Sequence, residues 1–514
     1  MRILVFPDIT IIILYIILVT GYGLWKAKKV KDSEDYLVAG RSLGLFVLVG
    51  TLVMTEFNTA AMIGYSSYAY LGGTFASLMA LMFLFGLGPY TLVVAKRWKR
   101  LNTVSISEMF EQRYDKRFRI FASLMIISTL ALFCTAYLKA ASLVFSMALN
   151  LDLVWTVILI SVIVLIFTLA GGLVSVSWTN LFSFVITIFA VPILFFISKY
   201  KADSLGGLAT AFNREFLSFN IFGMWNNPVL SFEFIFTLYA LLFLIYMQSP
   251  WYAQIMFATK NEKTAYRGMF IATIIVVLIY WFSIETAAFV KVGFPNLDDP
   301  QMAIPVAITY WMPIGIKGLT LALIFAVCQT TMATIWNNNA SIITQDIYRG
   351  LINPAASEKK VLFVSRSVTL FIALFTIIVS ITLIDVVIQV MFFANIFMVS
   401  LFFPAIGGFL WWKAGKKASW IATILGIISG WAIFFSKKYF NDGLPQWFQN
   451  HDWLFIYCCV AAPIVIIIGI LISLNEKTDE NFIKKKILFF EKVGAPWFGK
   501  KEFLKYKDDL KIEN

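Results

Sequence analysis

The sequence predicts an all-α membrane protein with about thirteen transmembrane helices. Of its 514 residues, 60% are hydrophobic and only 14% are charged, and the mean hydropathy is +0.81. One soluble core cannot bury that much apolar surface. The apolar residues also fall in successive runs of roughly 20, the length at which a helix crosses ~30 Å of hydrocarbon while satisfying its own backbone. These observations disfavour a soluble multidomain enzyme.

Charged residues separate the apolar runs and so set the ends of the expected helices. The expected spans are residues 7–26, 44–72, 75–95, 119–147, 152–171, 178–198, 229–258, 266–291, 316–345, 362–384, 386–411, 417–436 and 453–474. The first run is too long for a signal-peptide core, and no small-residue cleavage site separates it from Lys26. We therefore expect it to remain as a membrane anchor.

Basic residues mark one side of the membrane. The formal net charge is +13, but lysine and arginine gather in short connections between spans rather than on one face, so we expect no nucleic-acid partner. The basic connections on one side of the predicted spans are residues 26–31 with Arg41, 96–119, 260–267, 349–366 and 413–417. The positive-inside rule makes that side cytoplasmic. We expect a multi-pass protein of the inner (plasma) membrane with an external N-terminus and a cytoplasmic C-terminus.

The second span carries a rare ionisable side chain. A charge near the centre of a span costs ~2.5–3.5 kcal/mol on insertion scales, so it should face protein or water. Glu56 lies within the polar sequence MTEFNT at residues 54–59, and Gly64 follows. Such an interruption is typical of transporter sites, because unwound carbonyls can bind a cation. The alternative is that Glu56 pairs with a charge such as Lys139 of the fourth span, which is itself either a counter-ion or a site residue.

The ninth span carries a second polar cluster, QTTMAT at residues 329–334. Adjacent side chains point about 100° apart on a helix, so Thr330 and Thr331 share a cation only beside a distorted partner helix. Threonine in a membrane helix usually bonds to its own backbone or to a neighbouring helix. Together with the break in the second span, however, the pair favours a cation site.

The seventh span contains a proline within QSPWY at residues 248–252. Proline frees a backbone carbonyl that needs another partner, which predicts a kink. Trp251 either lines a solute cavity or is a packing residue, since aromatic residues make up 17% of the chain.

Three blocks of the sequence resemble the sodium:solute symporter family, which includes proline permeases and sodium/sugar cotransporters. Residues 35–43 read DYLVAGRSL, similar to the family's D-Y-x-x-A-G-R-S-L. Residues 170–180 contain AGG and then WTN, similar to G-G-x-x-x-V-x-W-T-D. Residues 317–348 contain KGL, TT and DIY, similar to the family's ion-binding helix. Several spaced blocks over roughly residues 7–440 make coincidence improbable.

The resemblance implies a LeuT-like core of five-plus-five helices in an inverted repeat. Residues 1–43 form an extra N-terminal span and a cytoplasmic loop, 44–200 the first repeat (spans two to six), 201–411 an external loop and the second repeat (spans seven to eleven), 412–475 two C-terminal spans, and 476–514 a basic cytoplasmic tail.

The resemblance also implies a sodium site between the two broken or polar helices. Its ligands map to the backbone oxygens of Met54, Phe57 and Val327 and to the hydroxyls of Thr330 and Thr331. Glu56 falls where proline-permease-like members carry an aspartate near the sodium, which implies a coupling role. Members that bind a second sodium use an acid and a hydroxyl where this chain has Asn180 and Ala333. We therefore expect one coupling sodium.

The expected solute site lies next to the sodium site. The candidate residues are Asn58, Ala61, Lys139, Ser249, Pro250 and Trp251. Sugar is disfavoured, because Ala61 replaces the family's sugar-binding glutamine and residues 249–251 replace the N-Q-Y of sugar carriers. Pro250 instead resembles the proline of a Q-P-H stretch in proline permeases, although Trp251 replaces the histidine.

The expected function is import of a small organic solute, such as an amino acid, by a sodium-coupled symporter that works by alternating access. We expect no enzymatic chemistry, Na⁺ as the coupling ion, and the solute, sodium and the lipid bilayer as partners, with no obligate protein partner. The alternatives are a proton-coupled carrier of the same fold, suggested by Glu56, and a membrane sensor that keeps a transporter fold.

Overall fold

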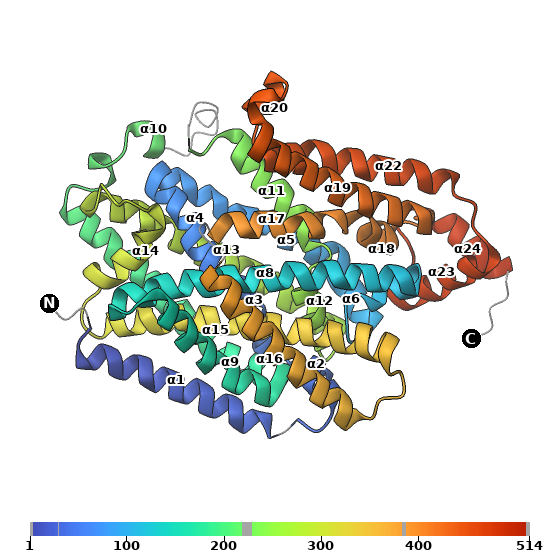
Figure 1. Cartoon of the computed structure of the whole chain (residues 1–514), viewed down its shortest axis with the longest axis horizontal. Helices are drawn as coiled ribbons and strands as arrows, with labels where there is room; N and C mark the ends of the chain where they lie inside the picture. The colour runs from blue at the N-terminus through green and yellow to red at the C-terminus, as the bar shows by residue number, and fades with distance from the viewer. Residues whose placement is uncertain (1–3, 29, 218–228, 383–386, 510–514) are drawn as a thin grey trace.

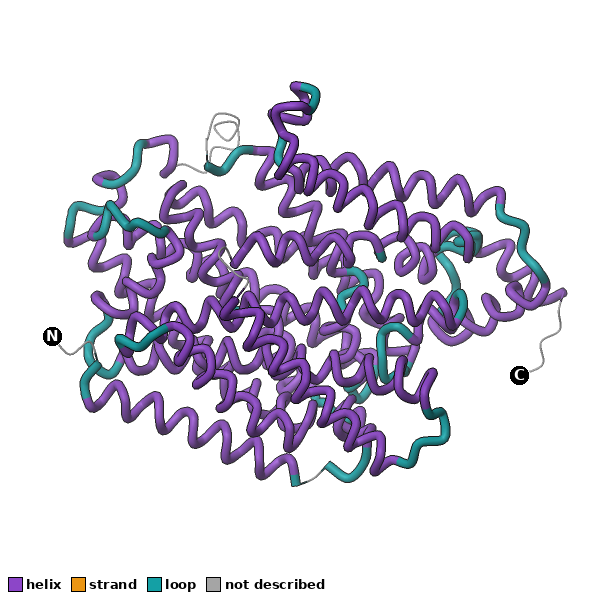
Figure 2. The backbone as a smooth tube through the Cα atoms, in the orientation of Figure 1, coloured by secondary structure: helices purple, strands orange, loops and turns teal. Residues whose placement is uncertain are grey.

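A computed structural model describes residues 4–28, 30–217, 229–382 and 387–509. Helices make up most of these ranges, and no strand occurs within them (Figure 2). Residues 218–228, which belong to the expected external loop, lie outside the described residues, and so do residues 383–386 of the expected spans.

The helices that form or flank the apolar segments are α1 (Phe6–Ala27), α3 (Leu45–Glu56), α4 (Thr59–Gly72), α5 (Leu81–Pro89), α6 (Ala95–Leu101), α8 (Lys116–Leu149), α9 (Leu153–Ser204), α11 (Phe232–Tyr246), α12 (Pro250–Phe257), α13 (Glu262–Gly293), α15 (Ile316–Ile342), α16 (Glu358–Thr382), α17 (Val387–Ser400), α19 (Lys416–Phe440) and α22 (Ala462–Asn475). The shorter or peripheral helices are α2 (Ser33–Val38), α7 (Glu108–Arg113), α10 (Arg214–Leu217), α14 (Ala303–Val306), α18 (Gly408–Leu410), α20 (Gln446–Asn450), α21 (Trp453–Phe455), α23 (Glu480–Val493) and α24 (Lys500–Asp509). Among the 3₁₀ and π segments, η2 (Gly73–Ala80), η3 (Tyr90–Val94), η8 (Ile343–Ile352) and η9 (Phe403–Gly407) continue or join the long helices.

The apolar segments are helical, but the number of spans differs from a simple hydropathy count. Within the described ranges, ten helices are long and apolar enough to cross a membrane, and the bent pair α11 and α12, which meet at 41°, adds an eleventh if it is one span. The helix α3 and residues 153–166 are shorter apolar helices. The expected second span is two helices, and the expected fifth and sixth spans lie on either side of a kink at Gly172 within α9. The count of about thirteen stays a prediction.

The long helices run side by side in one bundle, with α15 in its interior (Figure 1). The helix α15 is buried along nearly its whole length and packs against α1, α3, α8, α9 and α16. In Figure 1 the beginning of α1 and the helix α24 lie at opposite ends of the bundle. The two polar segments that the sequence singles out, in α3 and α15, therefore meet inside the protein.

The C-terminal helices are held against one end of the bundle by buried basic side chains. The Arg97 guanidinium donates to the carbonyls of Phe409 at 3.0 Å, Gly494 at 2.9 Å and Ala495 at 2.9 Å. A short bridge between Trp411 and Phe498 adds backbone hydrogen bonds. The segment therefore folds as part of the bundle rather than as a separate unit.

Candidate functional site

The helix break predicted at residues 54–59 is present. The helix α3 ends at Glu56, Phe57 is extended with φ −71° and ψ 100°, and α4 begins after Asn58. The Asn58 side chain closes the break, because its Oδ1 accepts from the Ala61 N–H at 2.7 Å and its Nδ2 donates to the Glu56 carbonyl at 3.0 Å. The Tyr280 hydroxyl donates to the same carbonyl at 2.9 Å. Buried side chains thus stabilise backbone that a continuous helix would satisfy by itself.

Four oxygen atoms of the expected sodium site lie together. Thr330 Oγ1 is 3.1 Å from the Met54 carbonyl oxygen and 3.1 Å from the Val327 carbonyl oxygen. Thr331 Oγ1 is 3.3 Å and 3.0 Å from the same two atoms. Phe57, the fifth expected ligand, lies at the break itself, where its conformation is extended. This donor set consists of uncharged oxygens, the kind that hard cations prefer.

The partners of Glu56 differ from those considered from the sequence. Its side chain is buried, and the hydroxyl of Tyr246 donates to Oε1 while the hydroxyl of Tyr252 donates to Oε2. Lys139 on α8 is only half-buried, and it forms no ion pair with Glu56 within the part of the chain that the structure describes. The structure therefore places two tyrosines, rather than Lys139, on the oxygens of this carboxylate.

A small cavity lies beside the break. Glu56 lines it together with three of the expected solute residues, Asn58, Ala61 and Trp251. The rest of the lining is largely aromatic and aliphatic, and its aromatic residues come from distant parts of the sequence: Tyr65, Phe83, Phe133, Tyr137, Tyr246 and Phe392. The cavity is therefore an apolar chamber rich in aromatic side chains, with one carboxylate in its wall.

Three expected solute residues do not line this cavity. Ser249 donates to the Ile245 carbonyl at 2.9 Å, and Pro250 is the first residue of α12, so both residues form the bend between α11 and α12. That bend places Trp251 at the cavity while its neighbours support the backbone. Lys139 is also absent from the lining, although Tyr137, two residues earlier on α8, is present.

Sequence reasoning missed most of the aromatic lining and one amide. Aromatic residues are too common in this chain for any one of them to stand out, and a tyrosine hydroxyl reveals its partner only in three dimensions. Asn395 of α17 also lines the cavity, and its Oδ1 atom has no hydrogen-bond partner among the described residues. A buried amide within an apolar run was the available signal for this residue.

A second, larger pocket adjoins the first. It has about 1320 Å³ of empty space and is lined by residues from α4, the start of α11 and the segment at 452–454, with Glu233, Asp299 and Asp452 among them. Phe392 lines both pockets and so lies between them. We call this second pocket the vestibule.

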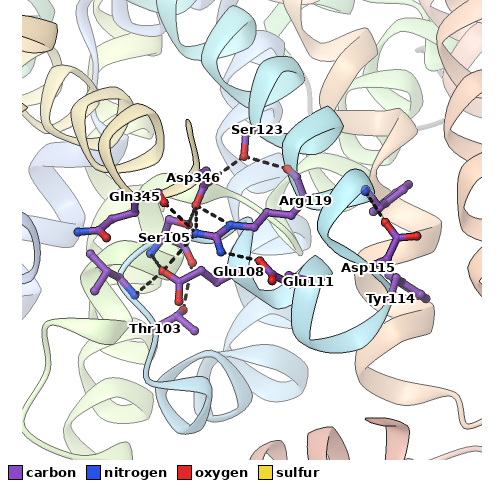
Figure 3. A network of polar contacts seen from close by, with 12 residues as sticks. Thr103, Ser105, Glu108, Glu111, Tyr114, Asp115, Arg119, Ser123, Gln345 and Asp346 are labelled. Atoms are coloured by element: carbon purple, nitrogen blue, oxygen red, sulfur yellow. Dashed lines mark hydrogen bonds and ion pairs between the residues drawn. The ribbon is translucent and has the colours of Figure 1, made fainter. Parts of the chain in front are cut away.

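A buried polar network ties α8 to η8, where the sequence has the DIY block (Figure 3). Arg119 donates to Asp346 Oδ1 from Nε at 2.9 Å and from Nη2 at 2.5 Å. Ser105 and Ser123 donate to the two oxygens of the same carboxylate at 2.6 and 2.7 Å. Nearby on α7, burial raises the pKa of Glu108, which lies 4.0 Å from Arg119. Fully satisfied networks of this kind hold helices in one arrangement.

Known proteins share both the sequence pattern and the fold. The profile of the Sodium:solute symporter family matches residues 36–426. A sodium/glucose cotransporter from Vibrio parahaemolyticus is 25% identical over 400 residues, covering 70% of this chain and 72% of that protein. A sodium/pantothenate symporter from Haemophilus influenzae is 25% identical over 429 residues, covering 81% of this chain and 88% of that protein.

Solved structures agree with this assignment at the level of the fold. A Na⁺-coupled sialic acid symporter in its substrate-bound, outward-open state superposes with a TM-score of 0.75 at 20% identity, covering 92% of this chain and 98% of that chain. MhsT in complex with L-phenylalanine superposes with a TM-score of 0.53 at 14% identity, covering 84% of this chain and 99% of that chain. The fold is that of LeuT-like transporters, as expected. The chain belongs to the sodium:solute symporter family.

Proposed function

We propose that this protein is a sodium-coupled symporter that imports a small organic solute together with one sodium ion. The observation that carries the proposal is the meeting of Met54 and Val327 carbonyl oxygens with the hydroxyls of Thr330 and Thr331. In the bound state these four oxygens and the Phe57 carbonyl replace the hydration shell of sodium. The threonine hydroxyls rotate so that their lone pairs face the ion.

The proposed stoichiometry of one sodium per solute rests on the side chains at two positions, one on α9 and one on α15. Asn180 on α9 is buried and carries a neutral amide, and Ala333 on α15 carries no oxygen on its side chain. Neither supplies the negative charge that a second cation needs in an apolar interior. Glu56 acts in coupling from the end of α3, two residues after Met54.

The solute occupies the aromatic cavity and reaches it from the vestibule. Phe392 lies between the two pockets, so its displacement opens the outer side. On the opposite side, the Arg119–Asp346 network has to separate before the inner side opens. Sodium bound at the break favours the outward-open arrangement, so solute affinity rises with sodium concentration and sodium affinity rises with solute.

The proposal also includes the sidedness of the two termini and the bounds of the two repeats. The N-terminus is external, the C-terminus with α23 and α24 is cytoplasmic, and the inverted repeats comprise residues 44–200 and 201–411. The buried contacts of Arg97 with the C-terminal segment agree with a tail that stays on the inner face.

Uptake into reconstituted vesicles tests the proposal. An inward sodium gradient is expected to drive accumulation of a transported solute above its external concentration, and a proton gradient alone is not. Accumulation driven only by protons would establish the proton-coupled carrier instead, for which the buried Glu56 is the motivating residue. Solute binding without accumulation under either gradient would identify a sensor with a transporter fold.

The variant Glu56→Gln tests whether the Glu56 carboxylate takes part in coupling. It keeps the size of the side chain but removes its charge, and the hydroxyls of Tyr246 and Tyr252 lose their charged acceptor. We expect weaker sodium dependence of uptake. Unchanged dependence on both sodium and pH would reject the coupling role of Glu56.

A further inference from the structure

The charge of the cavity wall indicates the class of solute. Glu56 is its one acidic side chain, and its lining, all of it within the described residues, contains no lysine, arginine or histidine. A carboxylate-bearing solute would therefore lose its hydration and find no cationic side chain, a large cost in a buried site. A positively charged group would meet the carboxylate directly.

Aromatic faces surround the same space. The Trp251 ring lies 5.8 Å from the ring of Phe133 and 6.4 Å from the ring of Tyr246, centroid to centroid, with interplanar angles of 54° and 90°. These three rings come from α8, α11 and α12 and line the same cavity. Rings arranged at such angles attract a cation through their negative faces, and tryptophan does so most strongly.

One amide oxygen of the wall is available to the solute. The Asn58 amide is already used at the helix break, where it bonds to the Ala61 N–H and the Glu56 carbonyl. Asn395 Oδ1 is buried and has no partner among the described residues. A ligand group that donates a hydrogen bond would satisfy this oxygen, since a buried acceptor without a partner is costly.

We propose that the transported solute is a small organic cation whose ammonium group lies between the Glu56 carboxylate and the faces of Trp251, Phe133 and Tyr246. A hydroxyl or N–H group on the same solute donates to Asn395 Oδ1. This inference rests on the proposed transport function and specifies its substrate class.

The vestibule provides a second, independent observation. Its ionisable lining is acidic, with Glu233, Asp299 and Asp452 and no lysine or arginine among the described lining residues. Basic groups near it include His451, whose Nε2 lies 3.8 Å from Glu233, and Lys437, whose charge acts on Asp452. A pocket of one sign attracts ions of the opposite sign and raises their local concentration. Because the vestibule attracts sodium as well, the selection of an organic cation depends on the inner cavity.

The test compares compounds of the same shape and different charge. The probes are choline, its uncharged isostere 3,3-dimethylbutan-1-ol, and glycine betaine, which adds a carboxylate to the same trimethylammonium group. Benzylammonium and benzyl alcohol form a second matched pair. Each is titrated against the purified protein in a thermal-shift assay, once in sodium and once in potassium, because ligands of the folded state raise the apparent stability.

We expect at least one ammonium compound to raise the melting temperature more than its uncharged isostere, and choline to protect more than glycine betaine. In Trp251→Leu the apparent affinity for that ammonium compound should fall about tenfold or more. Glu56→Gln should abolish the preference for the charged member of the pair. Trp155→Leu is the matched control, since Trp155 is an exposed tryptophan at the start of α9, outside the cavity.

The outcomes separate this inference from the function on which it rests. Protection by neither ammonium compound, equal protection by the uncharged isosteres, or stronger protection by glycine betaine would each overturn the cation assignment, whatever the result of the gradient experiment. Protection by an ammonium compound that is the same in sodium and potassium would support the assignment while contradicting sodium coupling.

Discussion

At the scale of single residues, the most informative signals are polar side chains in apolar runs. Glu56, Thr330 and Thr331 stand out in the sequence because burial of such groups in a membrane needs a reason. Tyr246 and Tyr252, which bind the Glu56 carboxylate, carry no such signal. A tyrosine is amphipathic and common in membrane proteins, so its partner depends on tertiary packing. This is why Lys139 was considered in their place.

The double variant Thr330→Ala, Thr331→Ala tests the hydroxyl ligands. Loss of two oxygens should raise the sodium concentration for half-maximal uptake at least tenfold, which corresponds to ~1.4 kcal/mol or more. The measurement is the sodium dependence of initial uptake rates in vesicles. Thr320→Ala is the control, because Thr320 lies on the same helix and its hydroxyl bonds to its own backbone at 2.9 and 3.0 Å. If the half-maximal sodium concentration changes equally in the double variant and in Thr320→Ala, Thr330 and Thr331 are not sodium ligands.

Lys486 on α23 gives a prediction about pH. Burial, with Arg113 adding to the effect, lowers the pKa of Lys486 from 10.5 to about 7. Between these values the unfolded chain binds a proton that the folded chain does not, so the stability from this residue rises as pH increases from about 7 towards 10.5. In Lys486→Met the melting temperature should lose this rise with pH.

The control for Lys486 is an exposed lysine of the same helix. Lys484 pairs with Glu480 at 2.7 Å on the surface, and Lys484→Met should keep the pH dependence of the parent. If Lys486→Met and the parent change in parallel between pH 7 and 9, the buried amine is not the source of the effect.

At the scale of elements, the interrupted helices decide the architecture. The interruption between α3 and α4 was predictable from polar residues, and the bend before α12 from Pro250. The boundary between the expected spans 152–171 and 178–198 was also predictable, because α9 is interrupted by a kink at Gly172. Gly172 adopts φ +49° and ψ −144° there, a conformation that turns the helix without ending its apolar run.

Gly172→Ala should destabilise the protein. A Cβ atom at this position would lie 2.4 Å from the Tyr36 carbonyl oxygen, and the backbone conformation alone costs a residue with a side chain ~1–3 kcal/mol. Gly21→Ala on α1 is the control, since its Cβ would meet nothing within 4 Å. Thermal unfolding should show a lower melting temperature for Gly172→Ala only, and equal values would contradict the strained bend.

The Arg119–Asp346 network is the second element-scale test (Figure 3). Asp346→Asn leaves Arg119 without its buried partner, which costs ~3–5 kcal/mol when no other anion compensates. The loss in the free energy of unfolding should lie near the lower limit of this range, because Glu111 remains 2.6 Å from Arg119. Hydrogen exchange should become faster in α7 and at the start of α8.

The surface pair Lys199–Asp203 provides the comparison for that network. Its side chains are about half exposed and 2.8 Å apart, so Asp203→Asn should change the stability by less than ~1 kcal/mol. Similar losses for Asp346→Asn and Asp203→Asn would show that the buried network does not hold α8 and η8 together.

At the scale of the whole molecule, hydropathy predicted a helical membrane bundle, and the family motifs predicted its LeuT-like fold. The sequence also located four of the oxygens that meet between α3 and α15. It did not predict the aromatic cavity, because that cavity is assembled from side chains on six or more separate helical segments. Nor did it predict how Arg97 fixes the C-terminal segment, since that contact joins residues about 400 positions apart.

Equilibrium binding of radioactive sodium to the purified protein is the most direct test of the central claim that sodium binds where α3 and α15 meet. We expect saturable binding of one ion per chain in the parent and in Thr320→Ala, and loss of that binding in the double variant Thr330→Ala, Thr331→Ala. Binding of unchanged affinity and stoichiometry in the double variant would contradict this claim.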